Sequence, residues 1–310
     1  MNQAPASNHW AQREERGNAL LLRLTAWAVR AFGRNMLIPV VKLVVLYFYA
    51  TGASSRRAIA EYQQRLICHT GRADLIPARH AVYRHYMEFA EFILDRLDVW
   101  QGKIRIEDIA IDDPDQLQAQ MGHGRGQMLL CSHHGNVEIS RTLAAHLPGL
   151  RLNILVHSRN ALRFHRMMES AGASTLNMIE VSDLDADTML ELSRRIDRGE
   201  WLAIAADRIP VRGNRTLPVQ FLGAAACFPQ GPWLLAGLLR CPINTLSCIR
   251  KQGRYHIRFK RLCDCLNWTR ATRTTEISRW MQRYADTLAL DCENAPLQWF
   301  NFYPFWADHA

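Results

Sequence analysis

The sequence predicts an α/β fold: a mostly parallel central sheet flanked by helices, with an N-terminal helical membrane-anchoring segment. From about residue 73, short apolar runs alternate with segments of helical periodicity, which is the pattern of strand–helix–strand units. The runs Gln127–Ser132 and Trp201–Ala206 are apolar almost throughout, as expected of strands that helices cover on both faces. We therefore predict one α/β domain over residues 73–310 and a membrane-associating segment over residues 1–72.

Length and composition exclude several classes of protein. The chain has 310 residues, of which 48% are hydrophobic and 22% are charged, close to the average for globular proteins. These values exclude a disordered chain, a collagen and a coiled-coil rod. The eight cysteines are too sparse for a disulfide scaffold and include no CxxC pair, so we expect reduced, mostly buried thiols and no metal site.

The positive charge of the chain is concentrated near its N-terminus. The formal net charge is +9, and residues 1–72 contain ten basic and three acidic side chains. A basic end of this kind suits nucleic acid or an anionic membrane surface. The aromatic residues stand among long aliphatic runs, and no nucleic-acid-binding motif is present, so we expect a membrane surface and no nucleic acid.

Two N-terminal segments carry the membrane prediction. Asn18–Gly33 has apolar residues on one helical face and two arginines on the other, and Asn35–Ser55 has a single charge, Lys42. The second segment is long enough to span a bilayer, but Pro39 and Lys42 argue against a clean span. Two interpretations stay open: a basic helical hairpin in the membrane interface, which we favour, and buried helices of an ordinary core.

The remaining elements follow from apolar periodicity and from turn residues. Helices are predicted at residues 79–97, 137–146, 161–171, 187–198, 231–239 and 275–290. Strands are predicted at residues 104–111, 127–132, 152–157, 201–206, 243–250 and 255–259, and residues 219–221 are expected to enter a turn at Gly223. Ligands of an open α/β sheet bind outside the carboxyl ends of its strands, so the residues that follow each buried strand are candidate site residues.

The most reactive part of the sequence is SHHGNVE, residues 132–138. His133 stands at a strand end, Gly135 permits a tight turn, and Glu138 falls in the first turn of the next helix, where a carboxylate is favoured. Because the chain reverses there, Glu138 could hold one nitrogen of the His133 imidazole while the other nitrogen accepts a proton. Asn136 is a candidate helix cap as well as a candidate substrate contact.

Spacing alone leaves other interpretations of this segment open. A histidine pair at a turn is often only a hydrogen-bonded structural feature, and His133, His134 and Glu138 are an incomplete set of metal ligands without an HExxH motif. The sequence also has no GxSxG, P-loop or GxGxxG motif. A serine hydrolase, an NTPase and a dinucleotide-dependent enzyme are therefore disfavoured.

SHHGNVE resembles the H-x4-[DE] box of the lysophospholipid acyltransferase superfamily, and more narrowly the H-x-G-N-W-E form of the lipid A late acyltransferase family, the lauroyl and myristoyl transferases. Further blocks along nearly the whole chain resemble the same family in the same order. They are Trp10–Gly17 with Gly33–Arg34, Arg57–Tyr62, Ala206–Arg208, Phe221–Gly223, Phe228–Gly231, Gln298–Phe300 and Phe305–Trp306. Val137 in place of tryptophan and the neighbouring His134 depart from the family's pattern.

The resemblance implies direct transfer of a fatty acyl chain from a thioester, usually on acyl carrier protein, to a hydroxyl of a lipid or glycolipid such as lipid A. It implies no cofactor and no acyl-enzyme. His133 would be the general base, and Glu138 would be its orienting partner. The substrate-binding candidates are Gly135, Asn136, Arg159, Asp207 and Arg208. Both arginines could equally be ordinary surface residues in an arginine-rich chain.

The resemblance also implies a place in lipopolysaccharide biosynthesis at the cytoplasmic face of the bacterial inner membrane, with the protein peripheral or N-terminally anchored. We expect a monomer, steered to the acidic acyl carrier protein by a basic face. Coenzyme A stays open as an alternative donor. Two other functions also stay open: a lipid esterase that uses the same His–Glu pair with water, and a non-catalytic membrane-binding protein.

Overall fold

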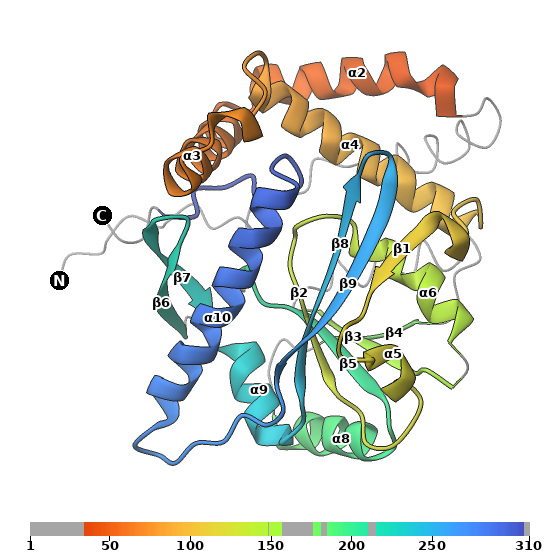
Figure 1. Cartoon of the computed structure of the whole chain (residues 1–310), viewed down its shortest axis with the longest axis vertical. Coiled ribbons are helices and arrows are strands. Elements are labelled where there is room, and N and C mark those ends of the chain that lie inside the picture. The colour runs from red at the N-terminus through yellow and green to blue at the C-terminus, as the bar shows by residue number, and fades with distance from the viewer. Residues whose placement is uncertain (1–33, 148, 157–175, 181–184, 210–214, 307–310) are drawn as a thin grey trace.

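A computed structural model of the chain describes residues 34–147, 149–156, 176–180, 185–209 and 215–306. At its centre lies a seven-stranded sheet with the strand order β1-β9-β8-β2-β5-β3-β4. Every pair of neighbouring strands is parallel except β8 and β9, which form an antiparallel hairpin. Helices lie on both faces of this sheet (Figure 1). The predicted α/β fold with a mostly parallel sheet is confirmed.

The strands agree with the prediction except at four places. The sheet contains β1 (Ile109–Asp112), β2 (Met128–Cys131), β3 (Leu152–Val156), β4 (Leu176–Glu180), β5 (Trp201–Ala205), β8 (Ile243–Lys251) and β9 (Arg254–Cys263). A separate antiparallel pair consists of β6 (Thr216–Phe221) and β7 (Ala224–Pro229). The sequence analysis missed β4 and β7, because LNMIE is interrupted by asparagine and AAACFP is rich in alanine, which is depleted in strands. It also did not predict β6, whose last three residues it assigned to the entry of a turn. The strand predicted at residues 104–111 starts late, because Ile106–Asp108 forms a 3-10 turn.

The helices surround the sheet largely where periodicity predicts them. They are α2 (Arg34–Thr51), α3 (Ala53–Thr70), α4 (Ala81–Trp100), α5 (Leu117–Gln120), α6 (Ser140–His146), α8 (Ala186–Asp197), α9 (Gly231–Leu239) and α10 (Arg273–Asn294). The helix predicted at residues 137–146 begins with the 3-10 turn Val137–Ile139 and continues as α6. The helix predicted at residues 161–171 lies outside the described residues.

Two hydrophobic cores lie on opposite faces of the sheet. Leu130 and Ile204 belong to the core that α3, α8, α9 and α10 share, whereas Leu129 and Ala203 belong to the core under α4, α5 and α6. Successive side chains of a strand point to opposite faces, and here both faces are covered. This explains why β2 and β5 are apolar without alternation. The eight cysteines are unpaired and most of them are buried, as predicted.

Helix α3 packs into the first of these cores. Its Tyr62 and Leu66 are buried there, and the ring of Tyr62 lies 5.0 Å from that of Trp299 near the C-terminus. The described part of the predicted N-terminal segment therefore shares a core with the α/β domain. The domain boundary at residue 72 stays a prediction.

Helix α2 has apolar side chains on every side and lies along one edge of the molecule (Figure 1). Val45 is buried against Ile59 and Tyr86, but the opposite side is exposed. The large exposed hydrophobic residues of α2 are Ile38, Val40, Leu43, Val44, Leu46, Tyr47 and Phe48. No single helix of the described residues is long and apolar enough to cross a membrane. The bent pair Leu37–Thr51 and Ala53–Thr70, at 92°, passes this test by length and composition. The predicted anchor is thus not confirmed.

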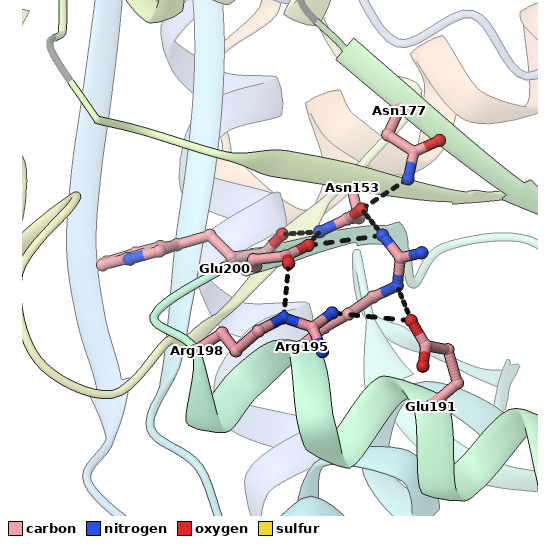
Figure 2. A network of polar contacts seen from close by, with 7 residues as sticks. Asn153, Asn177, Glu191, Arg195, Arg198 and Glu200 are labelled. Atoms are coloured by element: carbon pink, nitrogen blue, oxygen red, sulfur yellow. Dashed lines mark hydrogen bonds and ion pairs between the residues drawn. The ribbon is translucent and has the colours of Figure 1, made fainter.

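A polar network joins α8 to the amino ends of β3, β4 and β5 (Figure 2). Glu200 is 5% exposed and accepts hydrogen bonds from Asn153 at 3.0 Å and from Arg198 at 3.1 Å. The side-chain oxygen of Asn153 accepts from Arg195 at 2.7 Å and from Asn177 at 2.9 Å. Because each buried charge has a partner, the network stabilises this edge of the sheet.

Candidate active site

Strands β2 and β5 lie side by side and end together at one edge of the sheet. Cys131 pairs with Ala205, and the carbonyl of Cys131 accepts a hydrogen bond from the backbone N–H of Ala206 at 3.0 Å. His133 follows the end of β2 by two residues, and Asp207 follows the end of β5 by two residues. The parallel pairing of the two strands therefore brings these side chains to the same point.

His133 and Asp207 make two hydrogen bonds with each other. The imidazole Nδ1–H of His133 donates to Oδ1 of Asp207 at 2.8 Å, and the backbone N–H of His133 donates to Oδ2 at 2.8 Å. The indole N–H of Trp299 also donates to Oδ2, at 3.2 Å. Asp207 is only 1% exposed, whereas 36% of the His133 side chain is exposed. The carboxylate is thus fixed inside the protein, and the imidazole faces outward.

Burial and charge set the protonation of this pair. Burial would raise the pKa of Asp207, but attraction and hydrogen bonding to His133, together with Arg208, lower that pKa to about 2. Burial, aided by Arg208 and Arg96, lowers the pKa of His133 below its ordinary value, although Asp207 opposes this shift. Asp207 is therefore ionised and His133 is neutral near pH 7. A neutral imidazole whose Nδ1–H is held by a carboxylate can accept a proton at Nε2.

The backbone after His133 needs glycine. Gly135 has φ of +73°, and a Cβ at this position would lie 1.9 Å from the carbonyl oxygen of Cys248. The next residue confirms this close approach, since the N–H of Asn136 donates to the same carbonyl at 2.7 Å. Gly135, which the sequence analysis names as a substrate-binding candidate, thus permits the tight turn that follows His133.

The C-terminal segment of the chain holds the other side of this loop. The backbone of Phe300 donates to the carbonyl of His133 at 2.9 Å, and that of Gly135 donates to the carbonyl of Gln298 at 2.8 Å. The fully buried His134 donates through Nε2 to the carbonyl of Ala295 at 3.1 Å. His134 therefore has a structural contact and does not share a ligand set with His133.

The structure places the carboxylate of Asp207, which the sequence analysis did not pair with His133, at the Nδ1 of His133. Glu138 lies in the 3-10 turn Val137–Ile139, and the Nδ1 of His133 is bound by Asp207 instead. The predicted His133–Glu138 pair is therefore not confirmed. The distant Asp207 takes the orienting position because the two strand ends meet, which spacing along the chain does not reveal.

The predicted substrate-binding residues have different surroundings. Asn136 is 0% exposed, makes no helix-capping hydrogen bond, and donates to the carbonyl of Phe92 in α4 at 3.3 Å. Arg208 lies beside the pair, donates to the carbonyl of Phe300, and has its guanidinium carbon 6.0 Å from the ring centre of Tyr303. Arg159 lies outside the described residues. The structure therefore brings Asp207 and Arg208 to His133, and uses Asn136 to attach the loop to α4.

Two neighbours of His133 were missed as site residues from the sequence. Trp299 was noted only as part of a C-terminal block, and its indole binds Asp207. Arg96 lies on the same side of α4 as Phe89 and Phe92, and its charge acts on His133. The signal available in the sequence was the spacing of Arg96, four residues after Phe92 and seven after Phe89, which puts a charge on an apolar helix face.

The arrangement suits proton transfer. Among the described residues, no group of three or more histidine, cysteine, aspartate or glutamate side chains is placed to hold a metal ion. The His133–Asp207 pair has the geometry in which a carboxylate orients a histidine base and stabilises its protonated form. Such a base can activate a hydroxyl group for attack on a carbonyl carbon.

Comparison with known proteins agrees with this chemistry. The model of the bacterial lipid A biosynthesis acyltransferase family matches residues 64–307, which include the whole site. The chain is also similar to the phosphatidylinositol mannoside acyltransferase of Mycolicibacterium smegmatis, with 22% identity over 233 residues, 75% of this chain and 72% of that protein. The chain belongs to the lipid A biosynthesis acyltransferase family.

Proposed function

We propose that this member of the lipid A biosynthesis acyltransferase family transfers a fatty acyl chain from an acyl carrier protein thioester to a hydroxyl of a lipid or glycolipid. The observation that carries the proposal is the hydrogen bond between His133 and Asp207 at the carboxyl edge of the sheet. The family and the relative from M. smegmatis are both named for acyl transfer to glycolipids, which supports a glycolipid acceptor.

The proposed mechanism is direct transfer with His133 as the general base. Nε2 of His133 takes the proton of the acceptor hydroxyl as its oxygen attacks the thioester carbonyl. Asp207 keeps the imidazole in the required tautomer and stabilises the imidazolium. The carbon–sulfur bond then breaks, the thiolate receives the proton from the imidazolium, and the ester is released. No residue of the chain is acylated in this sequence.

We also propose that the protein works on a membrane surface, at the cytoplasmic face of the inner membrane. The exposed apolar side of α2 supports this, because side chains such as Leu43, Leu46 and Tyr47 would leave water on entering a lipid interface. The exposed Lys42 on the same helix would meet anionic headgroups. A lipid or glycolipid acceptor is confined to the membrane, so an enzyme bound to the membrane surface meets its acceptor there.

One assay tests the proposed reaction. Purified wild type and His133→Ala are incubated with radiolabelled acyl carrier protein thioesters and a bacterial lipid extract that contains lipid A precursors. We expect a new acylated lipid from wild type and its loss in His133→Ala. Free fatty acid as the sole product would replace acyl transfer with an esterase function. Products from coenzyme A thioesters alone would overturn the proposed donor.

A further inference from the structure

The carboxylate of Asp207 receives three N–H groups from two separate segments of the chain. The imidazole Nδ1–H of His133 donates to Oδ1 at 2.8 Å, and the backbone N–H of His133 donates to Oδ2 at 2.8 Å. The indole N–H of Trp299 donates to Oδ2 at 3.2 Å. With these two donors on Oδ2, the carboxyl group cannot turn about its Cβ–Cγ bond without losing hydrogen bonds, which keeps Oδ1 aimed at the imidazole.

The indole of Trp299 has a fixed position in the core. The side chain is 1% exposed, and its ring centre lies 4.9 Å from that of Phe305, 5.0 Å from that of Tyr62 and 5.3 Å from that of Phe221. The backbone carbonyl of Trp299 accepts a hydrogen bond from Nε2 of the buried His85 at 2.9 Å. A donor held in this way can orient the carboxylate, because close packing prevents it from following the carboxylate.

The residues on both sides of Trp299 bind the loop that carries His133. The backbone N–H of Phe300 donates to the carbonyl of His133 at 2.9 Å, and the carbonyl of Gln298 accepts from the backbone N–H of Gly135 at 2.8 Å. This short segment therefore fixes the loop through its backbone and the carboxylate of the His–Asp pair through one side chain. Both members of the pair are thus set relative to the same segment.

Burial alone does not give an indole a hydrogen-bond partner in this fold. Trp201 and Trp233 are both fully buried, and within the described residues their indole N–H groups have no partner. The indole of Trp299 instead donates to the carboxylate that binds the imidazole. A hydrogen bond to a buried charged group is stronger than one between neutral groups, so its loss should affect the pair.

We propose that Trp299 is a positioning residue for the general base: its indole N–H holds the carboxylate of Asp207 in the orientation in which Oδ1 binds the imidazole of His133. This inference rests on the acyl transfer proposed above and adds a residue that acts on the base only through Asp207. Without the indole donor the carboxylate can rotate. The imidazole then spends less time with Nδ1 protonated and with Nε2 free to accept the proton of the acceptor hydroxyl.

Two matched tryptophan variants test this role in the acyl-transfer assay. Trp299→Phe removes the indole N–H, and the control Trp306→Phe removes a second buried indole, whose N–H donates to the backbone carbonyl of Phe221 at 3.3 Å. We expect Trp299→Phe to lower kcat by about 10–100-fold and to leave KM nearly unchanged, because a misdirected base slows the chemical step without altering a substrate contact. Trp306→Phe should lose stability in urea denaturation without a comparable fall in kcat. An equal fall in kcat in both variants would assign the effect to the aromatic core and would count against the proposal.

The ring nitrogens of His133 give a readout that needs no substrate. Their NMR chemical shifts, read through the carbon-bound ring protons and assigned with His133→Ala, report the fraction of imidazole with its proton on Nδ1 above pH 6.5, where the ring is neutral. We expect this tautomer fraction to be near complete in wild type and in Trp306→Phe, and lower in Trp299→Phe. Benzothienylalanine at position 299 keeps the fused rings and replaces only the N–H by sulfur, so it should reproduce both effects without the loss of ring volume.

A double-mutant cycle shows whether Trp299 acts through Asp207. Trp299→Phe should have little further effect on kcat in the Asp207→Asn background, because the group that it positions is already changed. Additive losses in the cycle, or an unchanged tautomer fraction or kcat in the protein that carries benzothienylalanine, would overturn the proposal. Absence of acyl transfer by wild type, with the expected fall in the tautomer fraction, would instead count against the proposed reaction alone.

Discussion

The imidazole Nδ1 of His133 lies 2.8 Å from Oδ1 of Asp207, although 74 residues separate the two along the chain. The contact exists because β2 and β5 are adjacent parallel strands that end at the same edge. The carboxylate of Asp207 is buried and also accepts a hydrogen bond from Trp299, whereas the imidazole of His133 is partly exposed to solvent. This asymmetry is expected of the proposed general base, and the following predictions depend on it.

Asp207→Asn should reduce turnover more than Glu138→Gln does. Asparagine can keep the shape of the contact, but it removes the charge that stabilises the imidazolium and the acceptor that fixes its tautomer, so we expect kcat to fall by about 10³–10⁴. Glu138→Gln, which the sequence predicts to slow turnover, should have the smaller effect because Nδ1 is held by Asp207. The kcat of both folded variants is measured. The reverse order would restore the orienting role to Glu138.

In the pH profile of kcat/KM, the inflection on the acid side should lie below the ordinary pKa of histidine. A general base must be neutral, and burial together with Arg208 and Arg96 lowers the pKa of His133 from 6.5. Activity should therefore persist as the pH falls to 6.5 and decline only below it. Asp207 raises this pKa, so the residual activity of Asp207→Asn should have its acid limb at still lower pH. An inflection above 6.5 in wild type would contradict the lowered pKa of His133.

Two buried histidines should make folding sensitive to acid. Burial lowers the pKa of both His85 and His134 to about 4, so each stays neutral in the folded protein while the unfolded chain takes up protons below 6.5. Their contribution to stability is complete above pH 6.5 and is lost as the pH falls toward 4, by about 3 kcal/mol for each histidine. Urea denaturation at pH 7 and pH 4.5 measures this loss.

The matched variants show whether these histidines cause the effect. His85→Gln and His134→Gln should each flatten the pH dependence of the unfolding free energy, because glutamine takes up no proton. The control His69→Gln replaces an exposed ring on α3 and should leave the slope unchanged. An identical slope in all four proteins would assign the acid sensitivity to other groups.

Leu43→Asp should weaken the binding of the protein to lipid vesicles. Leu43 is 67% exposed on the outer side of α2, and its burial in an interface would contribute about 1.5–3 kcal/mol, or a factor of about 10–100 in affinity. Sedimentation with vesicles of phosphatidylethanolamine and phosphatidylglycerol measures the change. Leu238→Asp, at a 62% exposed position on α9, is the control. Equal loss in both variants would show that α2 is not the membrane-facing surface.

The sequence by itself determined the class of the fold and one half of the site. Apolar runs predicted β2, β5, β8 and β9, because strands covered on both faces are apolar throughout. Helical periodicity predicted most of the helices, because the repeat of a helix differs from that of a strand. It failed at β4 and β7, whose residues have weak strand preference and depend on their neighbours for pairing. It also identified His133, since a histidine after a buried strand stands at the ligand-binding edge.

Only the tertiary structure decided which carboxylate serves His133. Local spacing suggested Glu138, five residues away, whereas the order of strands in the sheet brought Asp207 to the imidazole. Sheet order depends on how helices pack over both faces, which no local pattern encodes. The same holds for Trp299, which reaches the site from the C-terminal segment. Sequence thus identified the proposed base, and the tertiary packing determined which residues contact it.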